Sequence, residues 1–99
     1  MILEVATLEI KPKQEQAFEA AFSEAQLIIS SMKGYISHQL HKSIESPNRY
    51  ILLVNWETLE DHTIGFREST EYQQWRTLLH HFYDPFPTVE HYNSVLRNL

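Results

Sequence analysis

Hydrophobic and polar positions along the chain predict four strands. Residues Ile2 to Ile10 are rich in β-branched and aliphatic side chains, which favour a strand. Tyr35 to Ile44 and Arg49 to Trp56 have the same character, and Thr88 to Leu96 alternates between apolar and polar residues. The segment Glu45-Ser46-Pro47-Asn48 carries typical turn residues, so the second and third strands should form an antiparallel hairpin.

A long helix is predicted between the first two strands. Its apolar residues recur three and four positions apart, at Phe18, Phe22, Ala25, Ile29 and Met32. Pro12 suits the first turn of this helix, where a missing N–H donor has no cost. Gly34 is placed to end the helix in a left-handed cap.

Two shorter helices are predicted after the third strand. Thr58 followed by Asp61 resembles a capping box and predicts the start of the first, and Thr70 followed by Gln73 repeats the pattern for the second. The apolar face of the second helix consists of Tyr72, Trp75, Leu79 and Phe82. The prolines of Asp84-Pro85-Phe86-Pro87 then end the helix.

This order of elements predicts an α+β fold of the ferredoxin-like split βαβ type, with a four-stranded antiparallel sheet and its helices on one face. Ninety-nine residues allow one domain, over residues 1–99. The central strands are apolar on both faces, since Leu3, Val5, Ile51 and Leu53 lie opposite the other apolar residues of the first and third strands. The helices can cover only one of these faces. Because such a face exposed to water would be a large adhesive patch, we expect it to pack on a second copy in a two-fold homodimer.

Composition excludes several classes of function. A formal net charge of -5, with eight scattered Lys and Arg residues, argues against nucleic-acid binding. The absence of cysteine excludes disulfides and thiolate chemistry. No apolar run approaches the roughly 20 residues of a membrane span, and the N-terminal residues lack the basic region of a signal peptide. A cytoplasmic protein with no membrane partner is expected.

The candidate chemistry lies between Trp56 and Trp75. His62 is one helical turn before Phe66, so the two share a face, where the imidazole could exchange a proton near neutral pH. The alternative is an exposed histidine, or one hydrogen-bonded within the core. His91 on the last strand either meets the same cavity or lies at the dimer interface.

Other candidate residues are less specific. Tyr72 and Trp75 share a helix face and either pack in the core or line a pocket. His80 and His81 stand late in their helix, where the helix dipole favours histidine. No metal-binding histidine motif, P-loop or dinucleotide-binding glycine motif is present, so neither a metal nor a nucleotide cofactor is expected.

Three segments carry a resemblance to a known family. They are Tyr35 to Asn48 with its Ser-Pro-Asn turn, Trp56 to Trp75 with Trp-Glu-Thr, Asp-His and Ser-Thr-Glu-Tyr, and Phe82 to Tyr92 with Phe-Tyr-Asp and His-Tyr. With these segments in this order, nearly the whole chain resembles the antibiotic biosynthesis monooxygenase domain family. That resemblance implies ferredoxin-like homodimers whose sheets meet in an α/β barrel, with a cavity between helices and sheet in each subunit.

The resemblance also implies a reaction. Enzymes of this family oxygenate polycyclic phenols or quinols with O2 and use no metal, flavin or other prosthetic group. On this basis His62 would be the base or the substrate clamp, Phe66, Tyr72 and Trp75 would wall the ring system, and His91 would hydrogen-bond a ring oxygen. The expected function is oxidation of a small phenolic or quinol-type aromatic molecule.

Two other functions remain as alternatives. One is a non-catalytic homodimer that binds a small hydrophobic ligand. The other is haem degradation, for which a related branch uses an asparagine on the first strand and a tryptophan on the second helix. Here the first strand has no asparagine and Phe66 stands about where that tryptophan would be, so haem degradation is disfavoured.

Overall fold

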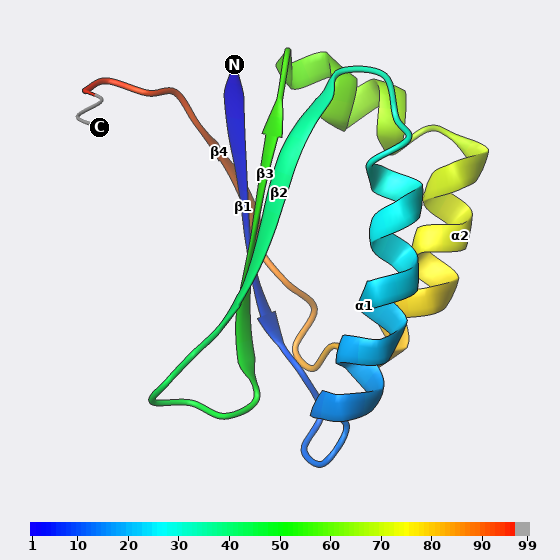
Figure 1. The fold of residues 1–99 in the computed structure, drawn as a ribbon, viewed down its shortest axis with the longest axis vertical. Helices are drawn as coiled ribbons and strands as arrows, with labels where there is room; N and C mark the ends of the chain where they lie inside the picture. Colours follow the sequence, from blue (N-terminus) through cyan, green and yellow to red (C-terminus); the bar gives the residue numbers. More distant parts are fainter. Residues whose placement is uncertain (97–99) are drawn as a thin grey trace.

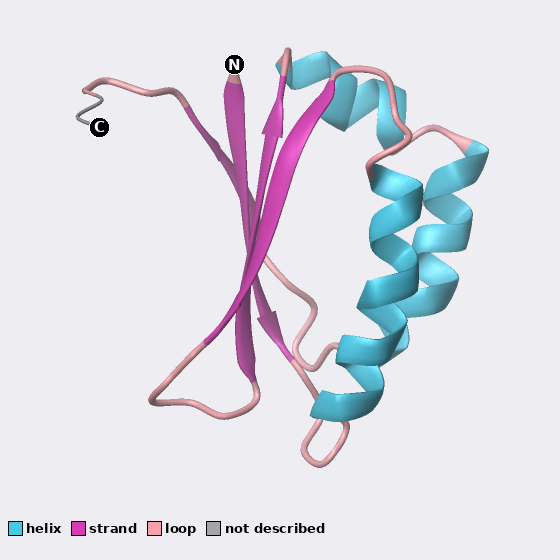
Figure 2. Ribbon diagram, in the orientation of Figure 1, coloured by secondary structure: helices cyan, strands magenta, loops and turns pink. Residues whose placement is uncertain are grey.

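A computed structural model describes residues 1–96 of the chain. The elements, in chain order, are β1 (Ile2–Glu9), α1 (Glu15–Ile29), β2 (Tyr35–Lys42), β3 (Arg49–Trp56), η1 (Asp61–Phe66), α2 (Thr70–Leu79), η2 (His80–Phe82) and β4 (Val89–Tyr92). The strands form one antiparallel sheet in the order β2-β3-β1-β4, and the helices lie on one face of it (Figures 1 and 2). The predicted ferredoxin-like α+β fold is confirmed.

The pairing of β1 with β3 and β4 positions Glu4 at the centre of the sheet. Glu4 lies opposite Val54 of β3 on one side and opposite His91 of β4 on the other. Side chains alternate between the faces of a strand, so Glu4, Ala6 and Leu8 all point towards the helices. All three are buried.

The core fills the space between the sheet and the helices. The predicted apolar face of α1 is confirmed, because Phe18, Phe22, Ala25 and Ile29 are its buried residues. These side chains pack against inward residues of the sheet and against residues of the second half of the chain, among them Tyr50, Trp56, Phe66 and Leu79. This packing fixes the sheet and helices relative to one another.

The ends of α1 differ from the prediction. Pro12 lies in a turn before the helix, which begins at Glu15, because Lys13 has a positive φ of 69° that no helix accommodates. The helix ends at Ile29, and Gly34 follows in a separate turn with φ of 85°. The left-handed conformation of Gly34 is confirmed, but its role as the helix cap was wrong.

The C-terminal part of the fold also needs corrections. Ser69, not Thr70, caps α2, because its hydroxyl accepts a hydrogen bond from the Tyr72 N–H at 3.1 Å. The helix ends at Leu79, and Phe82 belongs to the 3₁₀ turn that follows. The last strand spans four residues rather than Thr88 to Leu96, since only these pair with β1. The second strand ends at Lys42, two residues before the predicted end, and the hairpin turn and third strand are as predicted.

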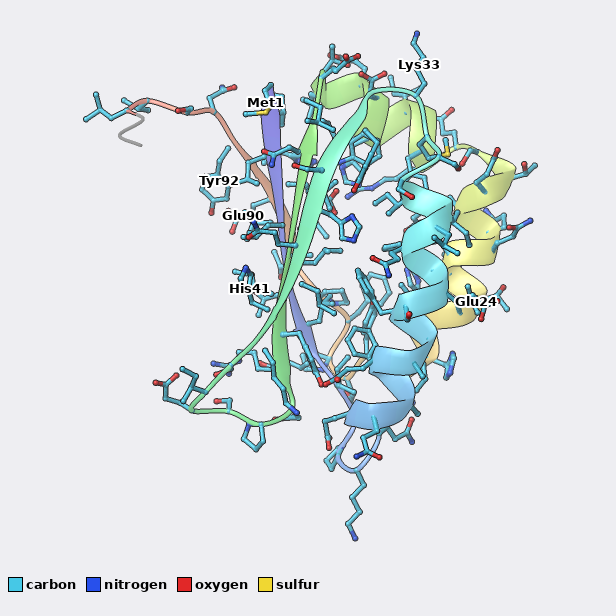
Figure 3. The ribbon with its side chains drawn as sticks, viewed as in Figure 1. Met1, Glu24, Lys33, His41, Glu90 and Tyr92 are labelled. Carbon is cyan, nitrogen blue, oxygen red and sulfur yellow. The ribbon has the colours of Figure 1, made fainter. Side chains whose placement is uncertain are left out.

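No element of the described residues lies over the sheet face opposite the helices. Figure 3 shows Tyr92, Glu90 and His41 on that side of the sheet. Between them Leu3, Val5 and Leu53 are half-buried, and Ile51 and Tyr92 are exposed. Within residues 1–96, no helix is long and apolar enough to cross a membrane.

Candidate functional site

A cavity of about 380 Å³ lies between the inner face of the sheet and the segment that runs from η1 through α2 and η2 to residue 87. This volume is at the small end of the range for ligand pockets, about 300–1,000 Å³. Its sheet side is formed by Glu4, Ala6, Leu8, Leu52 and Val89, and its helical side by His62, Phe66, Arg67, Tyr72, Trp75, His80, Tyr83, Phe86 and Pro87. The lining is therefore mostly aromatic and aliphatic, with a few titratable groups.

His62 reaches the cavity from the short helix η1. The predicted capping pair holds the start of this helix, because the Asp61 N–H donates to Thr58 Oγ1 at 3.1 Å and the Thr58 hydroxyl donates to the Asp61 carboxylate at 2.9 Å. The helix is a π-helix, whose wider turn is marked by the hydrogen bond from Arg67 N to the His62 carbonyl. Such turns recur at functional sites, and this one buries His62, 3% exposed, together with Phe66.

Glu4 is a carboxylate in the core-facing row of β1, only 5% exposed. Its Oε1 accepts a hydrogen bond from the Trp56 indole Nε1–H at 2.9 Å. The same oxygen lies 3.3 Å from Nε2 of His62. Both close polar contacts of this carboxylate therefore involve one oxygen, and the residue also lines the cavity. Sequence reasoning missed Glu4 as a site residue.

His91 completes a row of polar side chains. It lies across the β1–β4 pairing from Glu4, and its Nε2 is 2.8 Å from Nδ1 of His62. With Glu4 ionised, the consistent arrangement has His91 Nε2–H donating to His62 Nδ1, and His62 Nε2–H directed at Glu4 Oε1. His91 thus stands behind His62 rather than among the residues that line the cavity.

Burial sets the protonation of this row. Desolvation raises the pKa of Glu4 to about 7, against the lowering effects of the Trp56 hydrogen bond and the Arg67 charge. Desolvation, the Arg67 charge and the neighbouring His91 lower the pKa of His62 to about 3. Burial and Arg67 also lower the pKa of His91. At neutral pH both imidazoles are therefore uncharged, and Glu4 is divided between its acid and its carboxylate.

Aromatic rings form one wall of the cavity. The Phe66 ring meets Tyr72 and Trp75 edge-on, with centroids 5.2 and 5.6 Å apart. On the other side Phe66 lies 5.9 Å from Trp56, whose indole stacks on His62 at 5.4 Å. These contacts lie in the range of favourable aromatic pairs. The three predicted wall residues Phe66, Tyr72 and Trp75 therefore come together, and they both pack with the core and line the cavity.

A second aromatic group, formed by His80, Tyr83 and Phe86, also lines the cavity and adjoins the first wall, because the His80 ring lies 5.9 Å from that of Tyr72. The His80 ring is 5.5 Å from Tyr83 and 5.1 Å from Phe86. Burial and the Arg76 charge lower the pKa of His80, and burial is the main cause that raises the pKa of Tyr83. Sequence reasoning had assigned His80 to the helix dipole and had not placed Tyr83 or Phe86. Their signal was the aromatic and proline-rich composition of residues 82–87.

The row of Glu4, His62 and His91 does not have the arrangement of a metal centre. His62 lies between the other two, with a contact to each, instead of sharing a common point with them. Within residues 1–96, no group of three or more His, Cys, Asp or Glu side chains could hold a metal ion.

Comparison with known proteins identifies similar chains. The family model for antibiotic biosynthesis monooxygenase matches residues 1–78. The uncharacterized protein YczJ of Bacillus subtilis (strain 168) is 61% identical over 95 residues, covering 96% of this chain and all of that protein. A structure from Bordetella bronchiseptica assigned to the same family is 38% identical, with a TM-score of 0.92 over 96% of this chain and 97% of its own.

More distant structures share the fold. One is a variant of SnoaB from Streptomyces nogalater, which is described as a cofactor-independent oxygenase. It is 16% identical, with a TM-score of 0.74, and the alignment covers 99% of this chain and 94% of SnoaB. At this identity the likeness shows the common fold alone.

Proposed function

The chain belongs to the antibiotic biosynthesis monooxygenase family, and we propose that it is a cofactor-independent monooxygenase that oxidises a small phenolic or quinol-type aromatic molecule with O2. One observation carries this proposal. A buried carboxylate and a buried imidazole, Glu4 and His62, meet at the edge of a partly open cavity whose walls are largely aromatic and aliphatic. Such a site can hold an aromatic ring, remove a proton from it and keep water away.

The proposed reaction needs no prosthetic group because the substrate supplies the electrons. Removal of a phenolic proton leaves an electron-rich anion, which can reduce O2 directly. One oxygen atom then enters the ring system and the other leaves as water, while the substrate loses four electrons in total. The part of the protein is to bind the ring, generate the anion and exclude bulk water.

The geometry supports a division of roles within the cavity. Phe66, Tyr72 and Trp75 offer ring faces and edges for stacking on the substrate. The Glu4–His62 pair supplies the base. His91, proposed from the sequence to bind a ring oxygen, would support His62 through its 2.8 Å contact instead. The volume of about 380 Å³ favours substrates of one or two rings.

We further propose that the protein is a cytoplasmic homodimer joined through the open sheet face. The half-buried and exposed apolar residues on that face support this assembly. Gel filtration with light scattering at micromolar concentration should give twice the 11.7 kDa mass of the chain. A monomer under these conditions would contradict the proposed homodimer.

Oxygen uptake tests the proposed activity. The wild-type protein is mixed with a panel of one- and two-ring phenols and quinols, and O2 consumption is followed together with incorporation of labelled oxygen into the product. His62→Ala should lower the substrate-dependent uptake, because it removes the imidazole of the Glu4–His62 pair. His81→Ala is the matched control, because it removes an exposed histidine that does not line the cavity. Absence of substrate-dependent oxygen uptake by the wild type across the panel would contradict the proposal.

A non-catalytic ligand-binding protein is the second candidate. The lowered pKa of His62 favours it, because an imidazole that stays neutral down to pH of about 3 is a weak base. Quenching of tryptophan fluorescence by the same panel, with no oxygen uptake, would identify this function. Haem titration tests the remaining alternative, and we expect no Soret shift.

A further inference from the structure

We propose that Glu4 is the group that takes the proton from the substrate, and that His62 and Trp56 position its carboxylate. This assignment rests on the proposed oxygenase function and makes it more specific. It also differs from the sequence-based expectation, in which His62 was the base.

The contacts of His62 leave it without a free nitrogen. Its Nδ1 is 2.8 Å from His91 Nε2, and its Nε2 is 3.3 Å from Glu4 Oε1. The ring is also held flat against Trp56, with an angle of 20° between the planes. To accept a proton from a substrate, the imidazole would have to break one of these contacts and rotate away from the indole.

The carboxylate of Glu4 is held differently. Its Oε1 receives both the Trp56 indole N–H at 2.9 Å and the His62 edge at 3.3 Å. The residue lines the cavity, so Oε2 is the oxygen available to a bound molecule. A carboxylate fixed through one oxygen and open at the other is arranged as a general base.

The row of donors has a direction that supports this assignment. His91 fixes the tautomer of His62, and His62 then presents its N–H to Glu4. Each residue orients the next, and the row ends at the carboxylate that borders the cavity. The raised pKa of Glu4, about 7, suits a group that must accept and release a proton near neutral pH.

The proton transfer balances without a further reactant. The substrate O–H bond breaks, a new O–H bond forms at Glu4 Oε2, and the electron pair stays on the substrate oxygen. The titratable and charged groups around Glu4 come from five parts of the fold, namely His62 of η1 with the following Arg67, Tyr72 of α2, His80 of η2, Tyr83 after it and His91 of β4. Arg67 is the cation among them, and its charge would stabilise the anion that forms.

The assignment limits the class of substrate. A ligand must present an acidic hydroxyl to Glu4, so a phenol should bind better than its methyl ether, which has no proton to donate. 4-Nitrophenol and 4-nitroanisole are a suitable pair of probes, because their absorbance changes report binding directly. Wild-type protein should prefer the phenol by about tenfold or more, as a charge-assisted hydrogen bond allows.

Glu4→Gln tests the assignment, because glutamine keeps the shape and an acceptor for Trp56. It should lower the rate of oxygen uptake about 10²- to 10⁴-fold with a weakly acidic phenol, which is the usual contribution of a general base. The loss should shrink as the phenol becomes more acidic, because such substrates ionise without help. Glu9→Gln is the matched control. Glu9 is on the same strand, but its carboxylate pairs with Arg49 and does not line the cavity.

His62→Phe separates positioning from proton transfer. Phenylalanine can keep the stack on Trp56 but removes the N–H beside Glu4, so the carboxyl becomes harder to ionise. The rise of rate with pH should therefore move to higher pH, with most of the activity retained at the plateau. Loss of the rate at every pH in His62→Phe, with Glu4→Gln remaining active, would overturn the assignment and make the imidazole the base.

The two proposals fail in different ways. If wild type takes up no oxygen but prefers the phenol probe, and Glu4→Gln loses that preference, the oxygenase function fails while the contact to Glu4 stands. If wild type takes up oxygen and Glu4→Gln matches it on all phenols, the function stands and the role of Glu4 is refuted. Circular dichroism and the melting temperature of each variant exclude a trivial loss of folding.

Discussion

The buried pair of Glu4 and His62 should make the stability of the fold depend on pH in two opposite ways. The pKa of Glu4 rises from 4.5 to about 7 on folding, so the folded state binds more protons than the unfolded state between these values. Its contribution to stability is therefore full below pH 4.5 and is lost as the pH rises through 7. At 1.36 kcal/mol per pKa unit this change amounts to about 3 kcal/mol.

His62 has the reverse effect. Its pKa falls from 6.5 to about 3 on folding, so the unfolded state binds more protons in that interval. Its contribution is full above pH 6.5 and is lost as the pH falls through 3, which amounts to about 5 kcal/mol. The two effects oppose each other between pH 4.5 and 6.5, where the free energy of unfolding should change little because of this pair.

Glu4→Gln separates the two terms. The variant has no carboxylate to ionise, so its free energy of unfolding should not fall with pH for this reason. Relative to wild type, its stability should therefore rise by about 3 kcal/mol between pH 4.5 and pH 7. Urea denaturation at half-unit pH intervals and constant ionic strength, followed by tryptophan fluorescence, measures this difference. Glu9→Gln serves as the control for removal of a carboxylate from β1. A difference between Glu4→Gln and wild type that stays constant within about 0.5 kcal/mol would refute the reasoning.

Three further predictions follow from local geometry. Gly34→Ala should destabilise the fold by at least about 1–2 kcal/mol, because the φ of Gly34 is 85° and a Cβ there would overlap the Asp61 carboxylate. In urea denaturation, the same substitution made in an Asp61→Ala variant should cost less. Equal costs with and without Asp61→Ala would exclude the overlap. Ser69→Ala should cost about 1 kcal/mol in the same assay, since the Tyr72 N–H loses its cap, and no change would show that solvent replaces the hydroxyl. Phe86→Ala should weaken binding of 4-nitrophenol, because Phe86 lines the cavity. It should change stability by less than about 0.5 kcal/mol, because the side chain is 65% exposed. Unchanged affinity would place the ligand elsewhere.

The sheet and the long helix could be predicted because their signals are local and repeat. The third strand spans Arg49–Trp56 as its apolar composition indicated, and the buried face of α1 follows its apolar spacing. Ends of elements were less certain because adjacent residues compete for the same role. Ser69 and Thr70 are both good helix caps, and only the position of the Tyr72 N–H decides between them.

The candidate site was only partly predictable. His62, Phe66 and Trp75 stand close together in the chain, so the sequence could bring them to one face. The π-helical turn at His62 depends on a hydrogen bond from Arg67 that has no sequence signal known to us. The partners of Glu4 come from distant segments, and their meeting depends on the register of β1 with its neighbours.

Glu4 nevertheless left a trace in the sequence, as a carboxylate in the row that also contains Ala6 and Leu8. A charge in the core-facing row of a central strand conflicts with the pattern of the fold, and such conflicts concentrate at functional sites.

A purely structural role for Glu4 accounts for less of what is observed. The carboxylate does accept the hydrogen bond of Trp56 Nε1 and lies 3.3 Å from His62 Nε2, so removing it would take away both contacts. A structural network of this kind is normally closed by packing on all sides, because burial of a charge is costly unless every contact is used. Here the same carboxylate also borders a cavity of about 380 Å³ with aromatic walls. The open side of Glu4, more than its burial, indicates that the row of polar residues serves a bound molecule.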